Sequence, residues 1–126
     1  AFFTERIIGE FRSGNQVANC SKFLAFDQFD RGVRRRVKRL LAGQDDPNMI
    51  RESVSTFLTD GNRVSCVITE RELGRFVDPA LRANLSVLAE RYIWRDLRNR
   101  PHLYDRDPIL GIFRDRVLLV SNQPST

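Results

Sequence analysis

Three Asp-Pro pairs divide the chain of 126 residues into segments that are each expected to begin with a helix. The pairs are Asp46-Pro47, Asp78-Pro79 and Asp107-Pro108. An aspartate before a helix accepts hydrogen bonds from free N–H groups of the first turn, and proline is tolerated next because its missing N–H would have had no partner. Apolar residues then recur three and four positions apart, which favours helices over residues 47–58 and 79–99.

Three shorter helices are expected elsewhere. Residues 2–11 and residues 31–42 both carry apolar side chains at helical spacing, so that each segment has one apolar face. Thr69 and Glu72 have the spacing of a capping box, in which a hydroxyl and a carboxylate satisfy the first N–H groups of a helix. This pair predicts a short helix over residues 70–77.

Strand signals are confined to two places. Residues 63–69 are rich in β-branched side chains and form the best strand candidate. A single strand cannot satisfy its own backbone hydrogen bonds, and residues 116–121 are the expected partner. The apolar residues before that partner fit either a helix opened by Asp107-Pro108 or a hairpin strand over residues 109–113. We favour a helix that ends near Phe113 and is followed by the short strand.

These elements predict a mainly α fold with a minor β element (α+β), a compact bundle of about five to six helices plus a short strand pair. The longest helix, over residues 79–99, is expected at its centre. Residues 1–126 are expected to form a single globular domain, since 41% hydrophobic and 29% charged residues are ordinary for one. The chain starts at Ala1 and not at Met, which we interpret as a fragment or a processed product. No apolar run reaches the roughly 18 to 20 residues of a membrane-spanning helix.

Positive charge is the feature most informative about function. The chain holds 21 Lys and Arg against 16 Asp and Glu, a net charge of +5, and 19 of the cations are arginine. Guanidinium groups make planar, bidentate contacts with phosphate and stack on bases, which lysine does not. A GC-rich genome also enriches arginine, so the positions of the arginines matter more than their number.

The segment from Arg31 to Leu41 holds six cations and no acid. Helical spacing puts its aliphatic residues toward the core and most of its cations on the opposite, wet face, with Arg36 at the border. That face comprises Arg31, Arg34, Arg35, Lys38 and Arg39. Like charges four residues apart repel by about 0.2 to 0.5 kcal/mol per pair, and an anionic ligand would relieve this. The alternative is that flanking acids neutralise the helix, namely Asp27, Asp30, Asp45 and Asp46.

A second basic cluster is expected on the longest helix. Arg91, Arg95 and Arg98 share one face at helical spacing, and Tyr92 and Trp94 are interleaved with them. Aromatic rings beside arginines suit single-stranded nucleic acid, whose bases stack while the guanidinium groups hold phosphates. The alternative is that both aromatic residues belong to the core or to a subunit contact.

Few residues suit catalysis. His102 is the single histidine, and with Asp105 and Asp107 it could form a small active site or a metal clip, but the spacing matches no metal motif. We expect no catalytic residue, no metal site and no cofactor. Cys20 and Cys66 lack the spacing of zinc or redox sites. Buried free thiols in a reducing intracellular compartment, cytoplasm or nucleus, are the expected state, and a disulfide is the alternative.

The sequence therefore predicts a non-enzymatic nucleic-acid-binding domain, RNA favoured over DNA, that grips phosphates through the basic helix. One alternative is a protein-interaction or assembly domain, nucleocapsid- or replication-associated, with a protein partner or self-association. Its contact patch would consist of the phenylalanines Phe2, Phe3, Phe23 and Phe26. A further alternative is a small ribonuclease that uses His102. No membrane partner is expected, because the apolar face of the basic helix lacks Trp and Phe.

Overall fold

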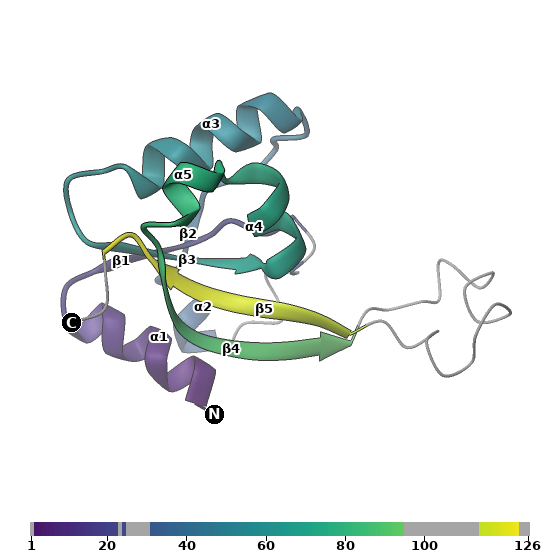
Figure 1. The fold of residues 1–126 in the computed structure, drawn as a ribbon. Coiled ribbons are helices and arrows are strands. Elements are labelled where there is room, and N and C mark those ends of the chain that lie inside the picture. Colours follow the sequence, from purple (N-terminus) through teal and green to yellow (C-terminus); the bar gives the residue numbers. More distant parts are fainter. Residues whose placement is uncertain (1, 23, 25–30, 95–113, 124–126) are drawn as a thin grey trace, which may run out of the picture.

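A five-stranded mixed sheet forms the centre of the protein (Figure 1). The computed structural model describes residues 2–22, 24, 31–94 and 114–123. The strands are β1 (Gln16–Asn19), β2 (Lys38–Arg39), β3 (Val64–Thr69), β4 (Ser86–Trp94) and β5 (Arg114–Ser121). The helices are α1 (Phe2–Arg12), α2 (Arg31–Arg34), α3 (Pro47–Leu58), α4 (Glu70–Phe76) and α5 (Pro79–Arg82).

The strands lie in the order β2-β1-β3-β5-β4. Strands β1, β2 and β3 run parallel, whereas β5 runs antiparallel to both of its neighbours. In the central strand β3, Cys66 is paired with Ala18 of β1 on one side and with Val120 of β5 on the other. All six residues of β3 are buried, as expected for a strand that is covered on both faces.

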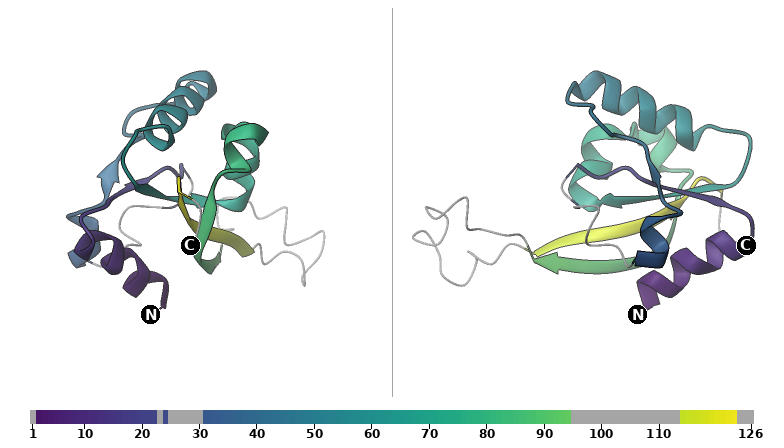
Figure 2. Two further views of the ribbon diagram at one scale, coloured as in Figure 1. Left: turned by 60° about the vertical axis from the view of Figure 1, so that its left-hand side comes forward. Right: turned by 180° about the vertical axis from the view of Figure 1, so that it is seen from behind.

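Helices cover both faces of the sheet. Figure 2 shows α1 and α2 on one face and α3, α4 and α5 on the other. Alternate residues of β3 serve the two layers: Cys66 packs with Val54 of α3 in one hydrophobic cluster, and Val67 packs with Ile7 of α1 in another. We call these the α3-side cluster and the α1-side cluster. The protein is thus a three-layer α/β structure, and its core lies on both sides of the sheet.

The prediction of a helical bundle with a short strand pair is wrong, because the sheet has five strands and only three of the described helices have seven or more residues. A physical signal for the larger sheet is present in β5. Residues 117–120 are apolar and all buried, so this strand is covered on both faces and needs a neighbour along each edge. Strand β3 supplies one neighbour, and the other had to come from a segment interpreted as helix.

The predicted helix over residues 79–99 is the segment that supplies it. The described part forms the short helix α5 and then β4, which pairs with β5. Leu81 and Leu85 pack against the α3-side cluster, whereas Leu88 and Ala89 belong to the α1-side cluster. Side chains that would share one face of a helix are therefore divided between the two faces of the sheet, which a single helix cannot achieve.

The predicted helix over residues 31–42 is wrong for the same reason. It ends at Arg34, and Lys38–Arg39 pairs with β1 as a short parallel strand. Val33 and Val37 are buried in the α1-side cluster, but Leu41 is buried in the α3-side cluster. Between them the chain forms β2 at the edge of the sheet, and the residues before and after this strand are buried on different faces. Repulsion between neighbouring cations and the low helix propensity of glycine at position 32 also disfavour a longer helix.

Elements with strong local signals were predicted correctly. Helices α1 and α3 and strand β3 lie where their patterns place them, and the Asp46 side chain accepts a hydrogen bond of 2.9 Å from the N–H of Asn48. The Thr69 hydroxyl caps α4 by accepting from the N–H of Glu72 at 3.2 Å. The C-terminal strand pairs with β3 as expected. The favoured helix ending near Phe113 lies outside the described residues.

Glu10 of α1 is a buried carboxylate that joins this helix to the sheet. It is 4% exposed and accepts hydrogen bonds from Ser65 Oγ at 2.9 Å and from Asn15 Nδ2 at 3.1 Å. It also forms an ion pair of 3.3 Å with Arg63. Burial raises the pKa of Glu10, but the hydrogen bonds and the ion pair outweigh it, so that the pKa is lowered.

This lowered pKa predicts a loss of stability in acid that depends on Glu10. The unfolded chain binds the proton more tightly, so the stabilisation is present above the ordinary glutamate pKa of about 4.3 and is lost as the pH falls through the folded value. In urea titrations between pH 6 and pH 2.5, the wild type should lose more stability than Glu10→Gln, whose amide does not titrate. Equal losses in the two proteins would contradict this role of Glu10.

Candidate nucleic-acid interface

The cations of α2, of the turn that follows it and of β2 lie together at one edge of the sheet. We call them the basic edge, and they are Arg31, Arg34, Arg35, Arg36, Lys38 and Arg39. Five of them are exposed and Arg34 is half-buried. Among the strands that the structure describes, β2 is the outermost on this side, so a ligand can approach it without displacing a strand.

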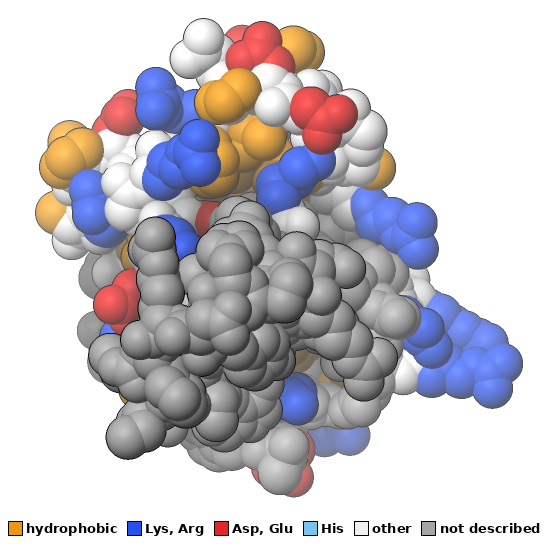
Figure 3. Space-filling model, turned by 90° about the vertical axis from the view of Figure 1, so that its right-hand side faces the viewer, with side chains coloured by type: hydrophobic (Ala, Val, Ile, Leu, Met, Phe, Trp, Pro, Cys, Tyr) orange, Lys and Arg blue, Asp and Glu red, His pale blue; other side chains and the backbone are white. Residues whose placement is uncertain are grey.

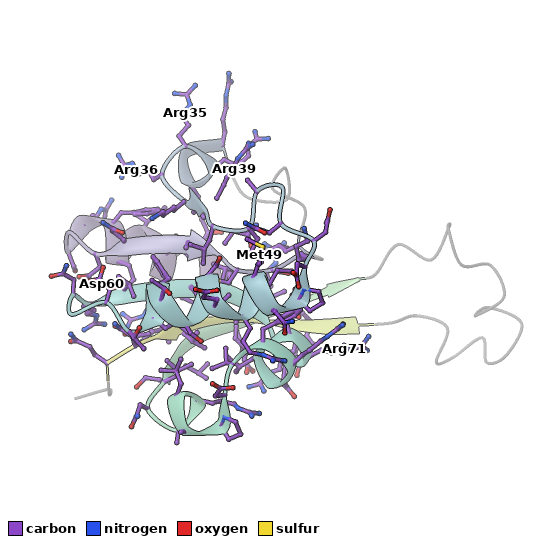
Figure 4. The ribbon with its side chains drawn as sticks, turned by 90° about the horizontal axis from the view of Figure 1, so that it is seen from above. Arg35, Arg36, Arg39, Met49, Asp60 and Arg71 are labelled. Carbon is purple, nitrogen blue, oxygen red and sulfur yellow. The ribbon has the colours of Figure 1, made fainter. Side chains whose placement is uncertain are left out.

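Two buried valines hold the basic edge in place. The N–H groups of Arg36 and Val37 both donate to the carbonyl oxygen of Val33 at 3.0 Å, which turns the chain sharply after α2. Val33 and Val37 are 3% and 5% exposed. Arg35 and Arg36, which lie between them, are exposed and point outward. Figure 4 shows Arg35 and Arg36 projecting away from the sheet, with Arg39 on the same side of the molecule.

Two of the acids that were candidates to neutralise these cations are engaged elsewhere. Asp45 forms an ion pair of 3.2 Å with Lys22, and Asp46 caps α3. Asp27 and Asp30 lie outside the described residues. Within the described part of the chain, Arg31, Arg34 and Arg35 form no ion pair with a carboxylate. In Figure 3, Lys and Arg side chains form a projecting group at the right-hand margin, on the α2 side.

An edge strand that carries cations also has a purely structural explanation. Charged side chains on an outer strand prevent the sheet from pairing with another chain. For this purpose Lys38 and Arg39 of β2 would suffice. The arginines of α2 and of the turn lie beyond the strand and are not needed for it, so the size of the cluster favours a ligand.

The second predicted cluster is not brought next to the basic edge. Arg91 and Tyr92 are both exposed, but they lie on β4, at the opposite edge of the sheet from β2. Consecutive residues of a strand point to opposite faces, so the helical face predicted for Arg91, Arg95 and Arg98 does not exist in the described part. Arg95 and Arg98 lie outside the described residues, and Trp94 is described only as the last residue of β4.

Arg116 contacts two acids, Glu70 of α4 and Glu90 of β4. Its guanidinium group donates to Glu70 at 2.6 Å and to Glu90, with a distance of 2.7 Å from Nε. These hydrogen bonds raise the pKa of Arg116, and the bond that Glu70 accepts has a larger effect than the one that Glu90 accepts. Glu90, the residue before Arg91 in the chain, is therefore bound by a different arginine.

Sequence reasoning missed two aromatic rings beside the basic edge. The Cζ atom of Arg36 lies 5.8 Å from the centre of the Phe11 ring, and the Nζ atom of Lys38 lies 5.9 Å from that of Phe57. The rings belong to α1 and α3, so they are remote in sequence from the cations. No local pattern connects them, and only the tertiary structure shows the pairs.

The residues predicted for an assembly interface, a ribonuclease site or a metal site contribute little in the described part of the chain. Phe3 is 7% exposed and packs in the α1-side cluster, so it does not supply a contact patch. Phe23 and Phe26, like His102, Asp105 and Asp107, lie outside the described residues. Cys20 and Cys66 are buried and free, as predicted. No group of three potential metal ligands occurs within the described ranges.

Comparison with protein-family models, with curated proteins and with solved structures finds no match for this chain. None of the helices within the described ranges has both the length and the apolar character needed to cross a bilayer.

Proposed function

We propose that the protein is a non-enzymatic nucleic-acid-binding domain, with RNA favoured over DNA, whose basic edge contacts phosphates. The observation that supports this most is the gathering of six cations at one accessible edge of the sheet. The arginines of α2 and of the turn have no described carboxylate to neutralise them. Arg31, Arg34, Arg35, Lys38 and Arg39 keep the role expected from the sequence, although they lie on a helix, a turn and a strand instead of on one helix.

The phosphates of a nucleic acid fit these side chains better than a membrane surface does. The fork of an arginine matches two phosphate oxygens, and a row of cations along an edge matches the regular charge spacing of a nucleic-acid strand. A membrane surface would also attract cations, but the apolar residues between them, Val33 and Val37, are buried and cannot insert into lipid. Free buried thiols are compatible with a reducing intracellular compartment, cytoplasm or nucleus, where such a protein would act.

Salt dependence tests the proposal. Five phosphate contacts on a single strand give a slope of about −3.5 for the logarithm of the binding constant against the logarithm of the salt concentration. Fluorescence anisotropy with a labelled single-stranded RNA, titrated at about 50 to 200 mM salt, should show an affinity that falls by about two orders of magnitude or more. A flat dependence, or no binding at about 50 mM salt, would overturn the proposal.

A further inference from the structure

We infer that Phe11 and Arg36 form a stacking subsite for an unpaired nucleobase beside the basic edge, so that the ligand is a single strand and not a duplex. This inference rests on the proposed function and deepens it. It replaces Tyr92 and Trp94 as the stacking residues, since Tyr92 lies at the opposite edge of the sheet.

Phe11 and Arg36 have the spacing of a cation–π pair. Phe11 is half-buried at the end of α1 and packs against the α1-side cluster, which holds its ring in place. Arg36 is exposed and lies with its guanidinium carbon 5.8 Å from the ring centre. Contact with the ring restrains the guanidinium group, whose outer side remains available to a base. Bases stack on arginine planes as well as on aromatic rings.

Two hollows lie next to this pair, and Phe11 and Arg36 line both of them. One has a volume of about 300 Å³ and is also lined by Asn15, Gln16 and Lys38. The other has a volume of about 350 Å³ and is also lined by Thr4, Ile8 and Val33. Sites for small organic groups have volumes from about 300 Å³ upward, so either hollow has room for one base.

The first hollow has the side chains that a nucleotide needs. Lys38 belongs to the basic edge and also lines the hollow, so a phosphate and its base can be held by adjacent groups. The exposed amide of Gln16 can donate to and accept from the polar edge of a base. Ring, guanidinium, amide and ammonium groups therefore meet at one place, and they come from α1, β1, β2 and the turn after α2.

The consequence is selectivity for unpaired bases. In a duplex the faces of the bases are covered by their neighbours, so Phe11 and Arg36 could contact only the backbone. In a single strand a base can leave the stack and enter the hollow. Phosphate contacts alone would give the same affinity for a strand that carries bases and for an abasic strand with the same number of phosphates.

Two oligonucleotides with the same number of phosphates separate the contribution of the bases to the affinity from that of the phosphates. One is a single-stranded RNA of ten nucleotides, and the other has abasic sugars at all ten positions. The wild type should bind the RNA about five to 100 times more tightly than the abasic strand. Phe11→Leu, which keeps an apolar side chain, should bring this ratio close to one. Arg36→Lys keeps the charge but loses the planar group, so it should also lower the ratio while binding of the abasic strand stays unchanged.

The control is Arg71→Gln, an exposed arginine that is labelled in Figure 4 and lies on α4, a helix on the other face of the sheet (Figure 2). It should leave the ratio unchanged. A wild-type ratio of one, or an unchanged ratio in Arg36→Lys, would overturn the stacking subsite even if Phe11→Leu failed to fold. Salt-dependent binding of both strands with a ratio of one would remove the subsite and keep the proposed function. Binding of neither strand would remove both.

Discussion

Replacing four cations of the basic edge should lower the affinity for single-stranded RNA by about two to three orders of magnitude at about 0.1 M salt. The variant carries Arg31→Gln, Arg34→Gln, Arg35→Gln and Lys38→Gln. Each lost phosphate contact removes the release of counterions that drives binding, and four losses reduce the salt slope from about −3.5 to about −0.7. The four side chains are exposed or half-buried, so the fold should be retained, and removal of like charges relieves repulsion.

A variant with the same change of charge elsewhere shows whether position or net charge matters. Arg51, Arg71, Arg75 and Arg82 lie on α3, α4 and α5, which cover the other face of the sheet, and none of them is buried. Changing these four to glutamine also removes four positive charges from the net +5. Affinity measured by anisotropy should fall far less in this variant. Equal losses in the two variants would show that the basic edge is not the binding surface.

Substitution of Glu72 by alanine should lower the free energy of unfolding by about 3 kcal/mol. Glu72 is 1% exposed, and its carboxylate accepts from Ser21 Oγ at 2.5 Å, Thr69 Oγ1 at 2.7 Å and the N–H of Lys22 at 2.7 Å. The three donors lie just after β1 and at the end of β3, so one carboxylate joins the ends of two adjacent strands. Alanine would leave a cavity and remove the acceptor of all three hydrogen bonds.

Glu70 provides the matched comparison, because it belongs to the same helix and its carboxylate also accepts a side-chain hydrogen bond, from Arg116. Its ion pair with Arg116 is exposed to solvent, so Glu70→Ala should cost less than about 1 kcal/mol. Urea unfolding followed by circular dichroism measures both variants. If Glu72→Ala were no less stable than Glu70→Ala, the buried carboxylate would not be a major contributor to stability.

The carboxylate of Glu72 also illustrates how far sequence reasoning reaches. The spacing between Thr69 and Glu72 correctly predicted the start of α4, because capping depends on residues three positions apart. Its contacts with Ser21 and Lys22 were not predictable, since these residues are brought close only by the parallel pairing of β1 with β3.

The same distinction applies to the basic edge. That the cations of residues 31–39 face water around buried valines was predictable from their alternation with aliphatic residues. The elements that carry these cations were not predictable, because Val33 and Val37 are buried on one face of the sheet and Leu41 on the other. The aromatic partner of Arg36 was not predictable from the sequence either, since Phe11 belongs to α1 and is remote from Arg36 in the chain.

By itself the sequence determined those elements whose signals are local: α1, α3 with its Asp46 cap, α4, and the β-branched strand β3. The tertiary structure decided whether apolar residues at helical spacing, as in residues 79–94, form a helix or supply both faces of a sheet. The physical reason is that the buried strand β5 must have hydrogen-bonding partners along both edges, and satisfying them outweighs the local helical preference of the segment that becomes β4.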